Sequence, residues 1–206
     1  MIIVPDDPGS GLVDETIRVA VTKVFDGDGF LASVWNPTRE TWVNRVAFRM
    51  AFIDAPELEQ PYGHESRDAL SILIAGKTLS LDPIAKESMN GVPLDPYKRV
   101  LCMAYLTEEM ERGEIQYYLN SACHSGFVKQ ARPVVRNIEL EMIVNGWAWV
   151  IEQYSFEREE EYFAAQDDAR AHGRGLWASN DPEPPWEFKR RMRRGTSKPD
   201  TQGRLF

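Results

Sequence analysis

The sequence has only two cysteines among its 206 residues, Cys102 and Cys123. Two cysteines are too few for a disulfide framework, and their spacing is not that of a metal site. We therefore expect two reduced thiols in a reducing compartment, although a single disulfide between them stays open. Histidines are also scarce. His124 follows Cys123 directly, but no third group supports thiol catalysis, so we expect both residues to be structural.

Long apolar runs are missing as well. No stretch of about 18 apolar residues occurs, so we expect no membrane-spanning helix and no membrane partner. The first residues, MIIVPDDPGSG, have neither a basic start nor an apolar core of about 7 residues, and therefore do not form a secretory signal. On this sequence we expect a cytoplasmic protein, and a secreted or periplasmic one only if a leader has been removed.

Positive charge is in the minority, because 24 Lys and Arg oppose 32 Asp and Glu for a net charge of -8. Such a chain does not bind nucleic acid through an overall basic surface. The charge is uneven, since residues 187–206 contain seven Lys or Arg and only two Asp or Glu. Two interpretations of this basic segment stay open: a solvated, disordered end, or an arm that binds phosphates.

The hydrophobic pattern predicts an α+β fold. Alternation predicts three strands, then an amphipathic helix, then two more strands. Five short strands with a helix after the third outline a five-stranded OB-type Greek-key barrel, whose closure removes exposed sheet edges. Two further helices, one capped by Asn137 and one preceded by Ser155, bring the expected number to about three. The predicted elements cover residues 16–25, 30–35, 41–53, 62–75, 77–81, 100–106, 137–145 and 155–172.

We expect one folded domain over residues 16–180. Residues 1–15 are predicted to be a flexible leader, and residues 181–206 a Pro-containing, basic, disordered tail. Residues 107–136 are an insertion of a length that is usually functional or disordered. Its interleaved aromatic and basic residues are compatible with single-strand binding, but we favour a helical insertion that extends the core.

Three short segments concentrate groups that can do chemistry. VFDGDGF contains Asp26 and Asp28, FRMAFIDAPE contains Arg49, Asp54 and Glu57, and DPYKR ends on Arg99. Taken alone, the Asp-Gly pair is a common hairpin turn. The loop is not an EF-hand, because Phe30 stands where a fifth-position oxygen ligand is required.

Together the three segments predict phosphodiester hydrolysis. Carboxylates from two strand ends can converge on a hard divalent cation. Two arginines can bind a phosphate bidentately and stabilise the charge that builds on its oxygens. One more carboxylate can orient water or accept a proton from it.

Six segments in order resemble the staphylococcal (micrococcal) nuclease family, the thermonucleases: VFDGDGF, FRMAFIDAPE, YGHES, PYKR, VNGWAWV and GRGLW. The resemblance extends from about Val21 to Trp177 and is interrupted by one insertion. It implies a calcium-dependent endonuclease (cofactor Ca2+) that cleaves DNA or RNA, including single-stranded DNA, and leaves 3'-phosphate ends. The oligomeric state stays open.

The resemblance also implies roles for individual residues. Asp28 and Asp54 match the calcium carboxylates, the backbone carbonyl of Ala55 a further ligand, and Asp26 an outer-shell acid. Glu57 matches the acid that holds or deprotonates the attacking water.

Phosphate and substrate contacts are implied in the same way. Arg49 and Arg99 match the phosphate-binding pair, and Tyr97 matches a tyrosine near the substrate phosphate. Lys98 and Tyr154 are further candidates for substrate binding.

The sequence departs from the family at several positions. Gly29 replaces the usual threonine, Lys98 replaces the glycine of YGR, and Pro96 stands where the founding nuclease has lysine. Glu152 replaces an aromatic residue that stacks a base, whereas Tyr154 keeps a second one, so base preference stays open. The alternative function is a catalytically weak or inactive module of this family that binds nucleic acid or a protein partner. We favour the enzyme because the acids and arginines are all present.

Overall fold

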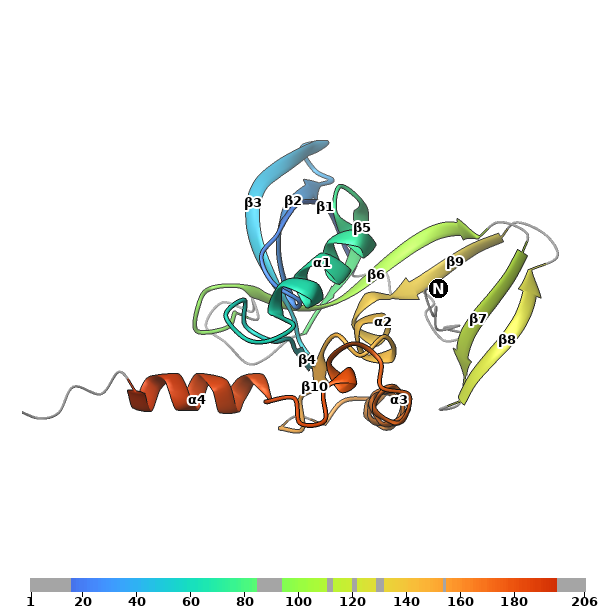
Figure 1. Cartoon of the computed structure of the whole chain (residues 1–206). Coiled ribbons are helices and arrows are strands. Elements are labelled where there is room, and N and C mark those ends of the chain that lie inside the picture. The colour runs from blue at the N-terminus through green and yellow to red at the C-terminus, as the bar shows by residue number, and fades with distance from the viewer. Residues whose placement is uncertain are drawn as a thin grey trace, which may run out of the picture.

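The computed structural model describes residues 16–84, 94–110, 113–119, 122–128, 132–153 and 155–195. Within these residues it has one main sheet, two small two-stranded sheets and four α-helices (Figure 1). None of the helices in these ranges is long and apolar enough to cross a membrane. The leader predicted over residues 1–15 and the end of the tail, residues 196–206, lie outside the described residues.

The main sheet closes into a five-stranded mixed barrel, as the sequence predicts. Its strand order is β3-β2-β1-β5-β6, and β3 pairs back onto β6 in parallel, with Arg49 opposite Leu101. Shifts in register after Val21 and after Ala32 mark bulges, which help strands to coil around a barrel. The strands are β1 Ile17–Val24, β2 Gly29–Asn36, β3 Thr41–Met50, β5 Thr78–Pro83 and β6 Val100–Met110.

The helices that follow the barrel in sequence, and a two-stranded ribbon, lie below the barrel in Figure 1. Helix α1 (Gly63–Ile74) connects the ribbon strand β4 (Ile53–Asp54) to β5, and β4 pairs with β10 (Trp149–Val150). The remaining helices follow the barrel in sequence: α2 Ile138–Val144, α3 Glu159–Ala171, a 3-10 turn Gly175–Ala178, and α4 Pro185–Gly195.

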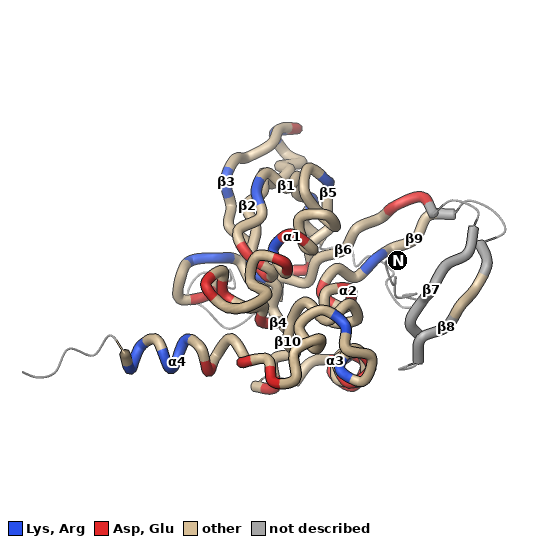
Figure 2. Tube along the Cα trace, viewed as in Figure 1, with Lys and Arg blue, Asp and Glu red and all other residues tan. Residues whose placement is uncertain are grey.

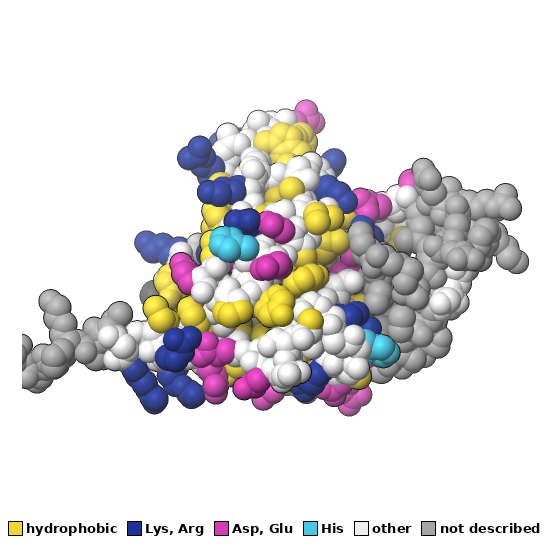
Figure 3. Space-filling view, viewed as in Figure 1, with side chains coloured by type: hydrophobic (Ala, Val, Ile, Leu, Met, Phe, Trp, Pro, Cys, Tyr) yellow, Lys and Arg dark blue, Asp and Glu magenta, His cyan; other side chains and the backbone are white. Residues whose placement is uncertain are grey.

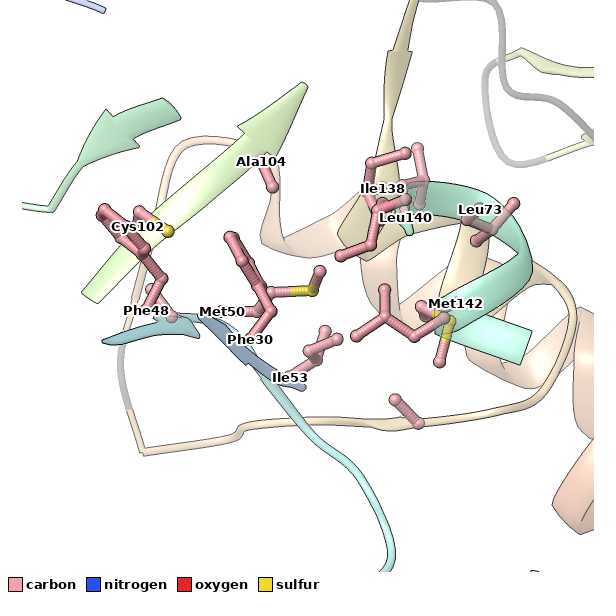
Figure 4. Packing of buried hydrophobic residues seen from close by; sticks show 14 of the residues in the cluster. Phe30, Phe48, Met50, Ile53, Leu73, Cys102, Ala104, Ile138, Leu140 and Met142 are labelled. Atoms are coloured by element: carbon pink, nitrogen blue, oxygen red, sulfur yellow. The ribbon is translucent and has the colours of Figure 1, made fainter. Parts of the chain in front are cut away.

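Apolar side chains from the strands and from α1 and α2 meet in one core (Figure 4). The rings of Phe30 and Phe48 stack 5.5 Å apart, and both are buried. The Asn137 side chain accepts from Leu140 N and so caps α2, as predicted. Cys102 is a free, buried thiol in this core.

A carboxyl group, Glu139, is buried completely beside this core. Its Oε1 accepts from Ala51 N at 2.7 Å, and the Tyr162 hydroxyl lies 3.2 Å from its Oε2. Burial raises the pKa of Glu139 from 4.5 to about 8, against the opposing effect of these hydrogen bonds. The carboxyl group is therefore mostly protonated in the folded protein at neutral pH.

The predicted end of the strand over residues 41–53 is wrong, because β3 ends at Met50. Ala51 N donates both to Cys102 O at 3.1 Å and to Glu139 Oε1, which bends the chain out of the barrel. Ile53 and Asp54 then pair with β10 instead of a barrel strand. The alternation of side chains between two faces continues across the bend, so the sequence pattern does not reveal where the strand ends.

The helical insertion predicted over residues 107–136 is also wrong. Strand β6 continues to Met110 and pairs with β9 (Arg132–Asn137), and between them β7 (Gly113–Leu119) and β8 (Ala122–Val128) form an antiparallel hairpin. Figure 1 shows this hairpin projecting from the body.

The disordered tail predicted from residue 181 contains a helix instead. Helix α4 begins at Pro185, a residue type that fits the first turn because its missing N–H has no intrahelical partner there. The prediction treated NDPEPPW as an end, although prolines of this kind also begin helices. Helix α3 likewise begins at Glu159, later than predicted after Ser155.

Candidate active site

The Asp26-Gly27-Asp28 segment is a tight turn that is packed against the rest of the molecule. Phe25 N donates to Gly29 O at 2.9 Å, and Asp28 N donates to the Asp26 carboxylate at 3.2 Å. A side chain on Gly27 does not fit, because its Cβ position lies 1.9 Å from Ser66 Oγ and 2.6 Å from Ala55 Cβ. The turn is thus wedged between α1 and the segment after β4, which fixes where Asp28 points.

Arg49 joins the two buried aspartates. Its Nη2 lies 2.8 Å from Asp54 Oδ1 and 3.2 Å from Asp28 Oδ2. Asp28 Oδ2 also accepts from Ala55 N at 3.0 Å. Because a single nitrogen touches both carboxylates, these two oxygens lie no more than about 6 Å apart. Oxygens across one Ca2+ with ligands near 2.4 Å are about 5 Å apart. This upper limit allows the two carboxylates to share one cation.

Burial dominates the electrostatics of this pair. Loss of solvation raises the pKa of Asp28, and Arg49 partly offsets that rise. Burial and the charge of Asp28 raise the pKa of Asp54, while Arg49 and Lys189 oppose the rise. Burial lowers the pKa of Arg49, but the two aspartates outweigh it and raise the pKa overall. The pair thus gains from every additional positive charge placed near it.

Glu57 stands at the edge of the same site. Its backbone N–H donates to Gln60 Oε1 at 2.9 Å, and its carboxylate lies 2.8 Å from Lys189 Nζ. Lys189 also lies 3.1 Å from Asp54 Oδ1. A lysine of helix α4 therefore links the predicted water-binding acid to a predicted metal ligand.

Arg99 enters the site from the loop before β6. Its Nε donates to Asp95 Oδ2 at 2.8 Å, and Asp95 Oδ1 accepts from the backbone N–H groups of Tyr97 and Arg99. The contact with Asp95 directs the guanidinium toward Gly29. A Cβ atom at residue 29 would lie 3.4 Å from Arg99 Nη1 and 2.8 Å from Asp26 Oδ1. The missing side chain at residue 29 thus leaves space between an acid and an arginine of the site.

Two further predicted residues lie at the surface of this loop. Tyr97 is 75% exposed, and the Arg99 guanidinium lies 5.6 Å from its ring centroid. Lys98 is exposed and has φ 64°, the left-handed conformation that glycine adopts most easily. The backbone therefore keeps a shape suited to the glycine that the resemblance leads one to expect here.

Most of the predicted residues line one open pocket of about 650 Å³. Asp54 is not among the lining residues, but it forms ion pairs with Arg49 and Lys189, which are. Lys98 does not line the pocket, and Tyr154 lies outside the described residues. The lining residues are Asp26, Asp28, Arg49, Ala55, Pro56, Glu57, Glu59, Tyr97, Arg99, Phe188, Lys189, Met192 and Arg193.

The contribution of α4 was missed by the sequence prediction. The sequence predicts a disordered tail here, yet Phe188, Lys189, Met192 and Arg193 form one wall of the pocket. The basic run KRRMRR indicates this role, because a phosphate-binding arm is one of the two interpretations that the sequence allows for it. What it lacked was any indication that this run folds back onto Asp54 and Glu57.

The donor chemistry suits a hard divalent cation. Two buried carboxylates offer oxygen ligands, as Ca2+ and Mg2+ require. In the described ranges, no group of three or more His, Cys, Asp or Glu side chains is arranged to hold a metal. Backbone and water oxygens would have to complete the coordination, which both cations accept.

The sequence of this chain matches a known family over part of the site. Residues 47–179 match the family model described as staphylococcal nuclease homologue. The chain belongs to this family. The match begins near the end of β3 and includes the Asp54–Glu57 segment, Arg99 and the helices as far as the 3-10 turn. Asp26 and Asp28 lie before the matched residues, and α4 lies after them. The resemblance seen in the sequence motifs is therefore confirmed.

Relatives of this staphylococcal nuclease homologue include two bacterial proteins of similar length. A Haemophilus influenzae protein named "Uncharacterized endonuclease" is 32% identical over 171 residues, 82% of this chain and 71% of that protein. An Escherichia coli protein of the same name is 31% identical over 177 residues, 85% of this chain and 86% of that protein.

A rice protein named "Probable staphylococcal-like nuclease CAN2" is 32% identical over 154 residues. These residues are 75% of this chain but 32% of the rice protein, so the chain spans about a third of that relative.

Proposed function

We propose that the chain is a calcium-dependent endonuclease that hydrolyses phosphodiester bonds of DNA or RNA. The observation that carries the proposal is the convergence of Arg49, Arg99 and Glu57 on one pocket beside the Asp28–Asp54 pair. The two bacterial relatives are both named as endonucleases, which supports the same reaction class.

Asp28 and Asp54 would hold the cation, with the carbonyl of Ala55 as a further ligand and Asp26 in the outer shell. Their oxygen chemistry and the short span between the two carboxylates support this assignment. When bound, a divalent cation supplies Lewis-acid neutralisation of the charge on the phosphate.

Arg49 and Arg99 would bind the non-bridging oxygens of the scissile phosphate. Arg99 is suited to this because Asp95 occupies its Nε, so that its terminal nitrogens point toward the pocket. A guanidinium placed there stabilises the charge of the pentacoordinate transition state more than that of the substrate.

Glu57 would orient the attacking water or accept its proton, with the 5' oxygen as leaving group. The products then carry 3'-phosphate ends. Its carboxylate is half-exposed at the pocket and is held by Lys189, so it has both access to water and a fixed position. Both roles require the carboxylate at this place.

The test is cleavage of a labelled single-stranded DNA by the full chain with CaCl2, and again with excess chelator. Cleavage is expected with calcium and should stop with chelator. Arg99→Ala and Glu57→Ala should each lower kcat by about 10²-fold or more. Arg39→Ala and Glu65→Ala remove the same charges at exposed positions away from the pocket and should keep wild-type activity.

Substrate that stays intact with every divalent cation tested would contradict the enzyme. Binding of the same DNA without cleavage would then assign the chain to the alternative class, a module that binds nucleic acid.

A further inference from the structure

Helix α4 carries a basic stripe that continues out of the pocket. Lys189, Arg190, Arg193 and Arg194 follow Trp186 at intervals of three and four residues, so all five side chains share one face of the helix. These five residues also line a second hollow of about 460 Å³ next to the first. Lys189 and Arg193 line both hollows, so the two share part of their walls.

The charge of α4 is opposite to that of the whole chain. Its eleven residues, PWEFKRRMRRG, contain five Lys or Arg and one Glu, whereas the chain has a net charge of -8. Figure 2 shows this concentration of Lys and Arg along α4, and Figure 3 shows their side chains gathered at the surface of the helix. A local basic surface within an acidic chain favours a polyanion at this place alone.

The start of α4 is fixed to the body, so its stripe has a defined direction. Phe188 is buried, Trp186 contacts Trp149 edge-on with ring centroids 5.6 Å apart, and Gln60 Nε2 donates to Glu183 O at 3.1 Å. Together with the contacts of Lys189, these hold the helix beside Glu57 and Asp54.

We propose that this stripe, named here the α4 stripe (Trp186, Lys189, Arg190, Arg193 and Arg194), binds the backbone phosphates next to the scissile one. The inference rests on the proposed nuclease function for the identity of the polyanion, a single nucleic-acid strand. From Lys189 to Arg194 the helix rises about 7.5 Å. One strand carries a phosphate about every 3.4 Å along a helix axis, so the stripe spans about two phosphates. The family match ends at residue 179, so this binding surface is additional to the matched domain.

The test is the double variant Arg190→Gln/Arg194→Gln of the full chain. Both side chains are exposed, and Arg190 pairs only across the helix surface with Glu187 in the described contacts, so the fold should be unchanged. The matched control is Arg39→Gln/Arg45→Gln, which removes two exposed charges from the far end of the barrel. Circular dichroism and the urea midpoint verify that both variants are folded.

Binding is measured by fluorescence anisotropy of a labelled 16-nucleotide single strand, in chelator so that no cleavage occurs, at several KCl concentrations. For the α4 variant we expect Kd to rise about tenfold at 100 mM KCl and the slope of log Kd against log [KCl] to fall by about 1.4, since each lost phosphate contact contributes about 0.7. Each single variant should give about half that change in slope. The control should stay within twofold of the wild type.

A second measurement uses a mononucleotide aryl phosphodiester, which fills the catalytic pocket without extending to Arg190 and Arg194, since these two residues line only the second hollow. Its kcat/KM should not change in the α4 variant. Equal Kd values and slopes for the α4 variant and the wild type, or an equal loss in the control, would overturn the proposal. Failure of the nuclease proposal looks different, because the wild type would then cleave neither substrate while the change in binding remained.

Discussion

Lys189 Nζ lies 2.8 Å from Glu57 Oε1. A residue that follows the family match, which ends at residue 179, therefore contacts the acid proposed to orient or deprotonate the attacking water. The same ammonium lies 3.1 Å from Asp54 Oδ1. The ammonium group of Lys189 therefore pairs with a carboxylate that is also proposed to bind the cation.

Lys189→Met should strengthen calcium binding. The variant removes a positive charge that competes for Asp54 and keeps most of the apolar stem. A partly exposed ion pair contributes about 0.2–1 kcal/mol, so we expect Kd for Ca2+ to fall by up to about fivefold. Isothermal titration calorimetry without nucleic acid measures this. Lys23→Met, at an exposed position of β1, serves as control and should bind calcium like the wild type. Unchanged or weaker binding in Lys189→Met would contradict the competition.

Gly27→Ala should destabilise the protein and lower its activity. The new methyl group meets Ser66 Oγ and Ala55 Cβ at distances far below van der Waals contact, so the turn that holds Asp28 must move. Overpacking of this kind costs about 1–3 kcal/mol. Urea denaturation and the cleavage assay report the two effects. Gly195→Ala is the control, because nothing lies within 4 Å of its Cβ position. A Gly27→Ala protein as stable as the wild type would refute the wedged turn.

Glu139→Gln should change how stability depends on pH. The folded carboxyl has a pKa of about 8 and the unfolded one about 4.5. Its contribution is fully present below pH 4.5 and is lost as pH rises toward 8, because the unfolded chain releases the proton more easily. Glutamine can still accept from Ala51 N but does not ionise.

The free energy of unfolding of Glu139→Gln, measured by urea titration, should therefore improve relative to the wild type as pH rises from 5 to 8, by up to about 1.4 kcal/mol per unit. Glu152→Gln, an exposed position, should follow the wild-type profile. Parallel profiles for Glu139→Gln and the wild type would show that Glu139 is ionised in the fold.

Lys98→Gly should stabilise the loop before β6. Lys98 has φ 64°, which costs a side-chain-bearing residue about 1 kcal/mol. The comparison with Lys98→Ala separates strain from charge, since both lose the ammonium and only glycine loses the Cβ. We expect Lys98→Gly to be about 0.5–1 kcal/mol more stable than Lys98→Ala by urea denaturation. If Lys98 contacts substrate, both variants should bind the labelled strand equally less tightly.

The barrel could be predicted from sequence because its strands are marked by local alternation and by turns. The catalytic candidates could be predicted because Asp28, Arg49 and Asp54 lie in short motifs at strand ends. The barrel brings these ends together, since Gly29 and Arg49 are neighbours across β2 and β3.

The remaining features depend on contacts between distant segments. The break after Met50 requires Glu139, which lies 88 residues after Ala51, and the position of α4 requires Lys189 to contact Asp54, 135 residues away. The hairpin in the insertion depends on pairing between β7 and β8, which composition alone does not distinguish from helices.

Strand β6 connects the two ends of the molecule. It begins at Val100, directly after Arg99, and ends at Met110, where the chain passes to the β7–β8 hairpin. Eleven strand residues extend over about 33 Å. Figure 1 shows the hairpin and α4 on opposite sides of the body. A fusion domain or anchoring surface attached at the hairpin would leave the mouth of the catalytic end unobstructed. Attachment at the hairpin and access to the candidate site are thus separable properties of this architecture.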